Sequence, residues 1–251
     1  MKILVTFAVA AEFAAWRRRH DFREISREPF PSFAATVGDS SVRALLTGIG
    51  TGAAAQATRW ALKSPADICV SSGFAGALGA DMAVGDLLAA RVVHRAEKEL
   101  AVASDHELLF AASDAGARRV ELFLTSEHLV ASAAEKAALS GSVDAVEMES
   151  FVVLAEAARH GVRAAAVRAI SDTLDTSLPY DFDRMRDERG QIRVSALVGE
   201  ILRHPAHLPG LIRLGRDCCV AAQRLADFLD EYVKLLEARL DLSQSEAVEA
   251  L

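Results

Sequence analysis

The chain has 251 residues, of which 51% are hydrophobic, so it is long enough to bury a sizeable core in one domain. Its net charge is −7, which argues against a nucleic-acid-binding surface, because phosphate backbones are bound by an excess of Lys and Arg. The three cysteines, Cys69, Cys218 and Cys219, lack metal-binding spacing, so we expect no metal site and a reducing, cytoplasmic location.

The first segment, MKILVTFAVAAEF, superficially resembles a signal peptide. Its apolar run is short, however, and ends at Glu12 ahead of the polar stretch AAWRRRH. We therefore interpret residues 2–9 as a first strand that is followed by a helix. No other stretch approaches the ~20 apolar residues that a membrane-spanning helix needs, so we expect no membrane span.

Apolar runs and Ala-rich segments alternate over the first two-thirds of the chain. The apolar runs predict strands, because several are nearly continuous, as in strands that are buried on both faces. They cover residues 2–9, 43–49, 67–73, 85–93, 120–125, 143–148 and 162–170. The Ala-rich segments predict helices at 51–62, 105–117, 132–140 and 149–160. This alternation predicts a single-domain α/β fold, a three-layer α/β/α sandwich with a central mixed, mostly parallel sheet.

After residue 194 the pattern changes to helices at 195–205 and 211–240. The second helix carries Leu, Ile and Val at helical spacing, so we expect it to pack against the sheet or a neighbouring subunit. Residues 241–251 are polar, and we expect them to fray. We assign residues 1–240 to the domain and residues 241–251 to a polar tail.

Two glycine-containing loops follow predicted strands, TGIGTGAAAQAT at 47–58 and SSGFAGALG at 71–79. Such loops let a ligand approach the backbone, although tight strand-to-helix turns use glycine as well. Neither contains GxGxxG or the lysine of a phosphate-binding P-loop, so dinucleotide binding is poorly supported.

Four acids, Glu12, Glu147, Glu149 and Asp172, lie at or near the ends of three apolar runs. Any one of them has an ordinary alternative as a helix cap. Ligands in such sheets bind at the carboxyl ends of the strands, so we expect the acids to converge there. Clustered carboxylates raise one another's pKa, and can therefore supply both an acid and a base near neutral pH.

The motif AVEMES at 145–150, followed by AISD at 169–172, resembles the nucleoside phosphorylase and nucleosidase superfamily. The TGIG and SGFAGAL loops are consistent with this resemblance, which covers residues 2–180. The branch that it most resembles holds methylthioadenosine/adenosylhomocysteine nucleosidase, futalosine hydrolase and the hopanoid-associated phosphorylase-like proteins. The segment ISDTLDTSLPYDFDRM and the helical tail look most like the hopanoid-associated and uncharacterised members.

The resemblance implies roles for individual residues. Asp172 matches the acid that protonates or hydrogen-bonds purine N7, and Ser171 would hold it. Glu149 matches the residue that binds the ribose hydroxyls, with Met148 packed against the sugar. Glu12 falls where nucleosidases keep the glutamate that activates water. Val130 falls where backbone groups meet the edge of the base. The loop beneath the sugar and the nucleophile would be formed by Phe74, Ala75 and Gly76.

Departures from the family pattern bear on the nucleophile and on the base. Phosphorylases bring arginines to the two glycine loops, but neither loop has a basic residue here, and this favours water. Arg43, Arg91 and Arg168 are the candidates for folding inward, and Arg168 alternatively pairs with Glu147. Leu129 stands where nucleosidases place an aromatic residue that stacks on adenine, and this departure implies a different orientation of the base, weaker binding, or an aromatic residue supplied elsewhere, such as Phe74.

Two further features have ordinary explanations. Residues 173–186 are either a lid over the 5′ side of a nucleoside or a solvated loop. His94 and His128 lie near strand ends, but we assign neither a catalytic role.

Three functional hypotheses follow. The first is hydrolysis of the N-ribosidic bond of a 5′-modified purine nucleoside, with Asp172 as the acid and Glu12 activating water. The second is a phosphorylase that uses phosphate and gives ribose 1-phosphate, and the third is a non-catalytic nucleoside-binding protein. We expect a small-molecule nucleoside as the partner, no cofactor and a homo-oligomer, and leave the 5′ substituent open.

Overall fold

The computed structural model describes residues 1–95, 100–178 and 208–249, with side chains as far as Arg239. Its strands are β1 (Lys2–Phe7), β2 (Arg23–Ser26), β3 (Ser32–Val37), β4 (Ser40–Leu46), β5 (Ile68–Ser71), β6 (Phe74–Ala77), β7 (Leu87–Arg95), β8 (Leu100–Ala103), β9 (Arg118–Thr125), β10 (Ala145–Glu147) and β11 (Arg163–Asp172). Its helices are α1 (Ala10–Arg17), α2 (Thr51–Ala61), α3 (His106–Asp114), α4 (Ala133–Leu139), α5 (Ser150–Arg159) and α7 (Leu208–Glu249).

The strands form one mixed sheet in the order β2-β3-β4-β1-β5-β11-β6-β10-β9-β7-β8, and β11 pairs additionally with β7. Parallel pairing joins β1 to β4 and β5, β11 to β5 and β6, and β9 to β7 and β10. The other pairings are antiparallel. The predicted mixed sheet is therefore confirmed, and its parallel centre brings several strand ends to one edge.

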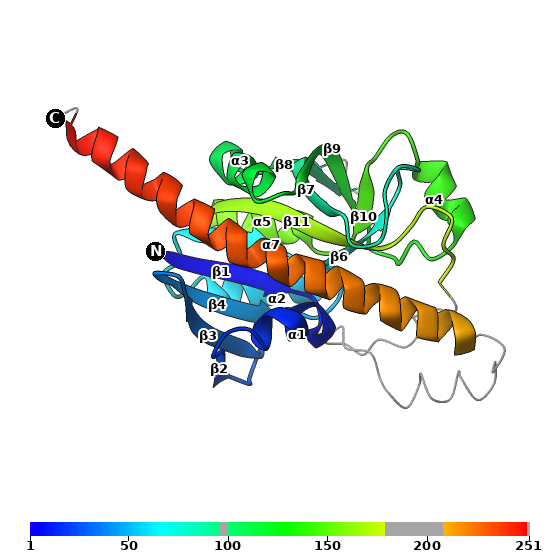
Figure 1. Cartoon of the computed structure of the whole chain (residues 1–251), viewed down its shortest axis with the longest axis horizontal. Helices are drawn as coiled ribbons and strands as arrows, with labels where there is room; N and C mark the ends of the chain where they lie inside the picture. Colours follow the sequence, from blue (N-terminus) through cyan, green and yellow to red (C-terminus); the bar gives the residue numbers. More distant parts are fainter. Residues whose placement is uncertain (96–99, 179–207, 250–251) are drawn as a thin grey trace.

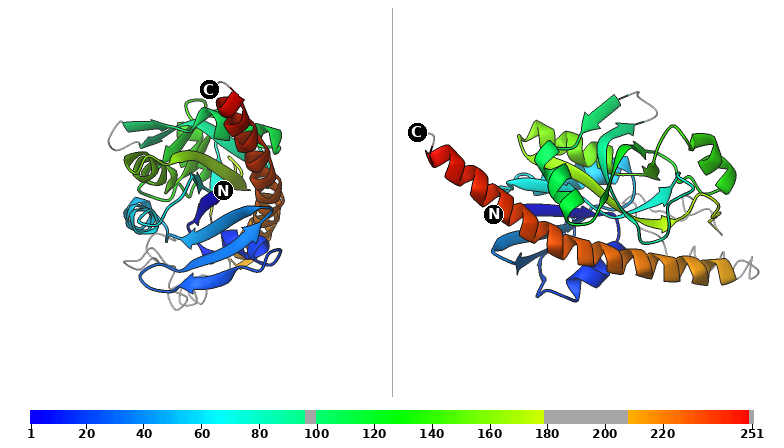
Figure 2. Two further views of the ribbon diagram at one scale, coloured as in Figure 1. Left: turned by 90° about the vertical axis from the view of Figure 1, so that its left-hand side faces the viewer. Right: turned by 45° about the horizontal axis from the view of Figure 1, so that its top comes forward.

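Helices cover both faces of this sheet, which confirms the predicted three layers (Figures 1 and 2). One core cluster joins the sheet to α1, α3 and α7, and a second joins the opposite face to α2 and α5. The central strand β11 shows no alternation of apolar and polar residues because residues 164–172 are all buried, including the charged Arg168. A strand covered on both faces has no solvent side on which alternation would place polar residues.

Four strands were not predicted. β2 and β3 mix polar and apolar residues, and β8 (LAVA) is an apolar run of only four residues, most of them exposed, so none gave a clear strand signal. β6 has the sequence FAGA, which we interpreted as part of a small-residue loop. That interpretation was wrong at Phe74, Ala75 and Gly76, because they pair with β11 and β10 as a strand.

The long helix α7 crosses the face of the sheet that also carries α1 and α3 (Figure 1). Its buried side chains recur at helical spacing, as predicted, and the hydroxyl of Tyr232 donates to the carbonyl of Leu108 at 2.9 Å. The helix continues to Glu249, so the backbone of residues 241–249 is helical and not frayed. The predicted helix at 195–205 lies outside the described residues. The division into a domain and a tail stays a prediction.

A polar cluster fastens α7 to α1. The carboxylate of Asp230 accepts hydrogen bonds from Trp16 Nε1 at 2.7 Å and Arg19 Nη1 at 3.0 Å, and its Oδ1 lies 2.7 Å from His20 Nε2. Burial alone would raise the pKa of Asp230, but these hydrogen bonds bring it below its usual range. Because α1 also carries Glu12, this cluster fixes the helix on which one candidate functional acid lies.

In the described part of the chain, no helix is both long and apolar enough to cross a membrane.

We expect Asp230→Ala to lower the free energy of unfolding by about 1–3 kcal/mol, because it leaves the partly buried indole N–H of Trp16 without its acceptor. Urea denaturation would measure the change. The control is Glu231→Ala, one residue along on α7, whose carboxylate is 53% exposed and pairs only loosely with Lys234 at 3.5 Å. The control should change stability by less than about 0.5 kcal/mol. Equal effects from the two variants would contradict the fastening role.

Candidate active site

A cavity of about 240 Å³ lies at the edge of the sheet where β1, β9, β10 and β11 end. It is mainly apolar, and the four acids Glu12, Glu147, Glu149 and Asp172 are among its lining residues. The predicted convergence of acids from distant parts of the chain is therefore confirmed. The other lining residues are Ala8, Val9, Ile49, Phe74, Ala75, Gly76, His128, Leu129, Val130, Val146, Met148, Ser171, Leu178, Leu214 and Cys218.

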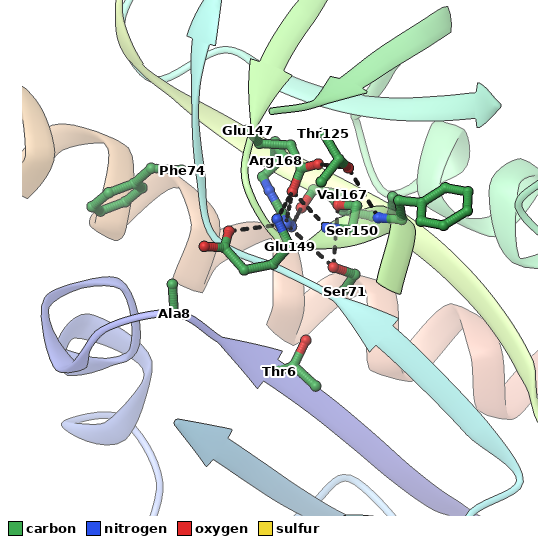
Figure 3. Close-up of polar contacts among 12 residues, drawn as sticks. Thr6, Ala8, Ser71, Phe74, Thr125, Glu147, Glu149, Ser150, Val167 and Arg168 are labelled. Carbon is green, nitrogen blue, oxygen red and sulfur yellow. Dashed lines mark hydrogen bonds and ion pairs between the residues drawn. The ribbon is translucent and has the colours of Figure 1, made fainter. Parts of the chain in front are cut away.

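A buried ion pair between Glu147 and Arg168 underlies this wall (Figure 3). Arg168 Nη2 donates to Glu147 Oε2 at 2.6 Å, and both side chains are almost fully buried. The same carboxylate accepts the backbone N–H groups of Glu149 and Ser150 at 2.9 and 2.7 Å, and the hydroxyl of Thr125. Glu147 thus caps the first turn of α5, and its predicted pairing with Arg168 is confirmed.

Glu149 faces the cavity from the start of α5. Its Oε1 accepts the N–H of Gly50 at 2.7 Å, and its Oε2 lies 4.0 Å from Arg168 Nη2. Burial and the neighbouring charge of Glu147 raise the pKa of Glu149 to about 8, against the partial opposition of Arg168. Gly50 has a φ of 95°, a left-handed conformation that favours glycine, so the TGIG loop presents this N–H at little steric cost.

Glu12 is buried in the third position of α1. Its Oε2 accepts the N–H groups of Ala8 and Val9 at 2.6 and 3.1 Å, and its Oε1 accepts that of Phe74 at 2.9 Å. Burial raises the pKa of Glu12, although these N–H groups and Arg168 partly oppose the shift. A Cβ on Gly73 would lie 2.6 Å from Glu12 Oε1, so only glycine leaves room for this carboxylate.

Asp172 ends β11 at an irregularity in the pairing with β6, where the register shifts between Ile170 and Asp172. Its Oδ1 accepts the hydroxyl of Ser171 at 2.7 Å, as predicted for the residue that holds it. Its Oδ2 is paired with the buried ammonium of Lys136. A Cβ on Gly76 would approach Asp172 Oδ2 to 3.0 Å, so glycine in β6 lets this carboxylate reach the cavity.

All nine residues that we assigned to the site line the cavity, although their individual roles stay predictions. Sequence reasoning missed three contributors. Lys136 lies in a predicted helix, but nothing in the local pattern marks it as buried. Leu214 and Cys218 come from a helix to which we gave only a packing role. Leu178, which also lines the cavity, belongs to the segment 173–186 that we interpreted as a lid or a solvated loop.

Of the three arginines that we considered as candidates for folding into the site, two lie away from the cavity. Arg43 donates to carbonyls at the end of α2, including that of Ala61 at 3.0 Å, and Arg91 pairs with Glu121 on the surface. Among the described lining residues there is no lysine or arginine, and the site is therefore acidic. Within the described ranges, no group of three or more His, Cys, Asp or Glu side chains is arranged to hold a metal ion.

The raised pKa of Glu149 has a consequence for stability. Between its unfolded value near 4.5 and its folded value of about 8, the folded protein binds more protons at this site than the unfolded chain. The contribution of Glu149 to stability therefore falls as the pH rises through this range. Glu149→Gln cannot titrate, so its stability relative to wild type should increase from about pH 5 to about pH 8 in urea denaturation. Parallel curves for the two proteins would contradict the shift.

The chain matches the family model described as the phosphorylase superfamily over residues 2–203. No curated protein sequence matches it. Among solved structures, it resembles the 5′-methylthioadenosine/S-adenosylhomocysteine nucleosidase of Neisseria meningitidis in complex with methylthio-immucillin-A, with a TM-score of 0.71 and 22% identity over 93% of this chain and 98% of that one.

It also resembles the futalosine hydrolase of Helicobacter pylori, with a TM-score of 0.71 and 19% identity over 93% of this chain and 97% of that one. At these identities the likeness shows the fold alone, whereas the family match spans most of the sequence. The chain therefore belongs to the phosphorylase superfamily.

Proposed function

We propose that the protein hydrolyses the N-ribosidic bond of a purine nucleoside. The observation that carries this proposal is the set of three carboxyl groups, Glu12, Glu149 and Asp172, on one mainly apolar cavity. The nucleosidases among the similar folds act on purine nucleosides with a 5′ substituent, and this supports the same class of substrate here.

The chemistry requires these groups in separate positions. Breaking the bond between C1′ and N9 leaves an oxocarbenium-like sugar and an electron-rich purine. A proton or hydrogen bond at N7 would neutralise the departing base, and Asp172 would deliver it after its carboxylate, which is ion-paired with Lys136, has taken up a proton from solvent. Glu149 would hold the ribose hydroxyls, and Glu12 would take a proton from the attacking water. Glu12 lies against Gly73, just before β6, and Asp172 lies against Gly76, within β6. One short segment therefore sets the separation between the carboxylate that would activate water and the carboxyl group that would act at N7.

Water is favoured over phosphate as the nucleophile because the described cavity lining offers the carboxyl groups of Glu12, Glu149 and Asp172 and no lysine or arginine. A phosphate dianion there would lose its hydration without gaining a cationic partner. The buried Arg168 is already paired with Glu147, and Lys136 with Asp172. Phosphorolysis would therefore need a cation from elsewhere.

A base-release assay over adenosine, inosine, guanosine and 5′-methylthioadenosine tests the proposal. With and without phosphate, we expect release of free base from at least one nucleoside at the same rate, with free sugar as the other product. Asp172→Asn should reduce the rate by about 10²-fold or more, because it cannot supply a proton. Strict dependence on phosphate would indicate a phosphorylase, and binding without release would indicate a nucleoside-binding protein.

Gly73→Ala should reduce kcat/KM on the order of 10²-fold, because the added Cβ would displace the Glu12 carboxylate. The matched control is Gly52→Ala in α2, where an added Cβ meets no atom within 4 Å. The control should retain activity to within about twofold, because an exposed helical Gly→Ala change mainly affects helix propensity. Full activity in folded Gly73→Ala, checked by circular dichroism, would show that the position of Glu12 does not matter.

A further inference from the structure

We propose that Lys136 is a positioning residue that fixes the orientation of Asp172 and of the turn after it. This inference rests on the proposed function, because it assigns Lys136 to the service of the acid in that reaction. The proposal starts from the observation that the side chain of Lys136, on the short helix α4, is fully buried. Lysine is almost never fully buried unless it is paired.

Every proton of this ammonium has an acceptor. Lys136 Nζ is paired with Asp172 Oδ2 and donates to the carbonyls of Thr173 at 2.9 Å and Thr176 at 3.0 Å. An ammonium group has three N–H donors and no acceptor, so this set satisfies it completely. One buried cation thus binds the acid and two points of the chain that follows it.

The carboxylate of Asp172 is consequently held on both oxygens. Ser171 donates to Oδ1 at 2.7 Å, and Lys136 donates to Oδ2. The side chain therefore cannot rotate without breaking one of two charge-assisted hydrogen bonds, which are roughly twice as strong as neutral ones. Gly76 provides the room, because an added Cβ there would lie 3.0 Å from Asp172 Oδ2 and 3.5 Å from Lys136 Cε.

The turn that Lys136 binds also forms part of the cavity wall. The N–H of Thr176 donates to the carbonyl of Thr173 at 3.0 Å, and that of Leu178 donates to the carbonyl of Ala131 at 2.8 Å. Leu178 itself lines the cavity. Lys136, which lies on α4, therefore binds both Asp172 and the turn that leads to Leu178 on the cavity wall.

A purely structural role is the alternative, and energetics argue against it. Two apolar side chains of similar volume hold a fold at least as well as a buried ion pair, because the pair must recover the cost of desolvating both charges. A positioning role predicts that kcat falls when Lys136 is replaced, whereas a purely structural role predicts an unchanged kcat in the folded variant.

The test compares wild type with Lys136→Met, which keeps an unbranched side chain one atom shorter and removes its charge. On a nucleoside that the wild type cleaves, we expect kcat to fall on the order of 10²-fold, with KM changed by less than about threefold. The matched control is Lys63→Met, at an exposed position after α2. An unchanged kcat in folded Lys136→Met would overturn the proposal.

A double-mutant cycle separates positioning from general damage. If Lys136 acts through Asp172, adding Lys136→Met to Asp172→Asn should lower kcat by less than about threefold further. Fully multiplicative losses would overturn the proposal. The double variant leaves no unpaired carboxylate, so it also serves if Lys136→Met alone fails to fold.

Hydrogen exchange provides a readout that does not depend on turnover. The amides of Thr176 and Leu178 should exchange about tenfold faster or more in Lys136→Met than in Lys63→Met, because the turn loses its anchor. Unchanged exchange would overturn the positioning role. If the wild type cleaves no nucleoside, the proposed function fails, and this exchange measurement still decides whether Lys136 holds the turn.

Discussion

The candidate site depends on one buried ion pair, between Arg168 in the central strand and Glu147 at the end of β10. A guanidinium among the apolar residues of β11 is stable only when it is paired. Its partner uses the rest of its carboxylate to cap α5, and this sets the position at which Glu149 enters the cavity. The two acids of the AVEMES motif therefore have different tasks, since one holds the backbone that presents the other.

The three proposed functional carboxyl groups share a common mode of support. Each is held by donors that belong to the backbone or to a neighbouring side chain, and glycine creates the space or the backbone conformation in each case. Glu12 depends on Gly73, Glu149 on Gly50 and Asp172 on Gly76. The glycine loops of the sequence thus bring N–H groups and space to carboxylates of this protein.

The sequence predicted the α/β layers and the acids of the site because both depend on features that are local in the chain. Continuous apolar runs identify strands buried on both faces, and the motif around Glu147 and Asp172 lies at their ends. β6 was missed because its sequence, FAGA, is short and mostly small residues, so its strand conformation depends on pairing with β10 and β11. Lys136, Leu214 and Cys218 were missed for a related reason, since their place on or beside the cavity follows from packing between distant segments.

The position of α7 has a consequence for the order in which the protein matures. Leu214 and Cys218 close the cavity, and the buried face of α7 covers α1, which carries Glu12. During synthesis the N-terminal acid and its helix leave the ribosome long before the segment that covers them. The cavity lining is therefore complete on the growing chain only after α7 has emerged, and until then the face of α1 that α7 covers lacks its packing partner.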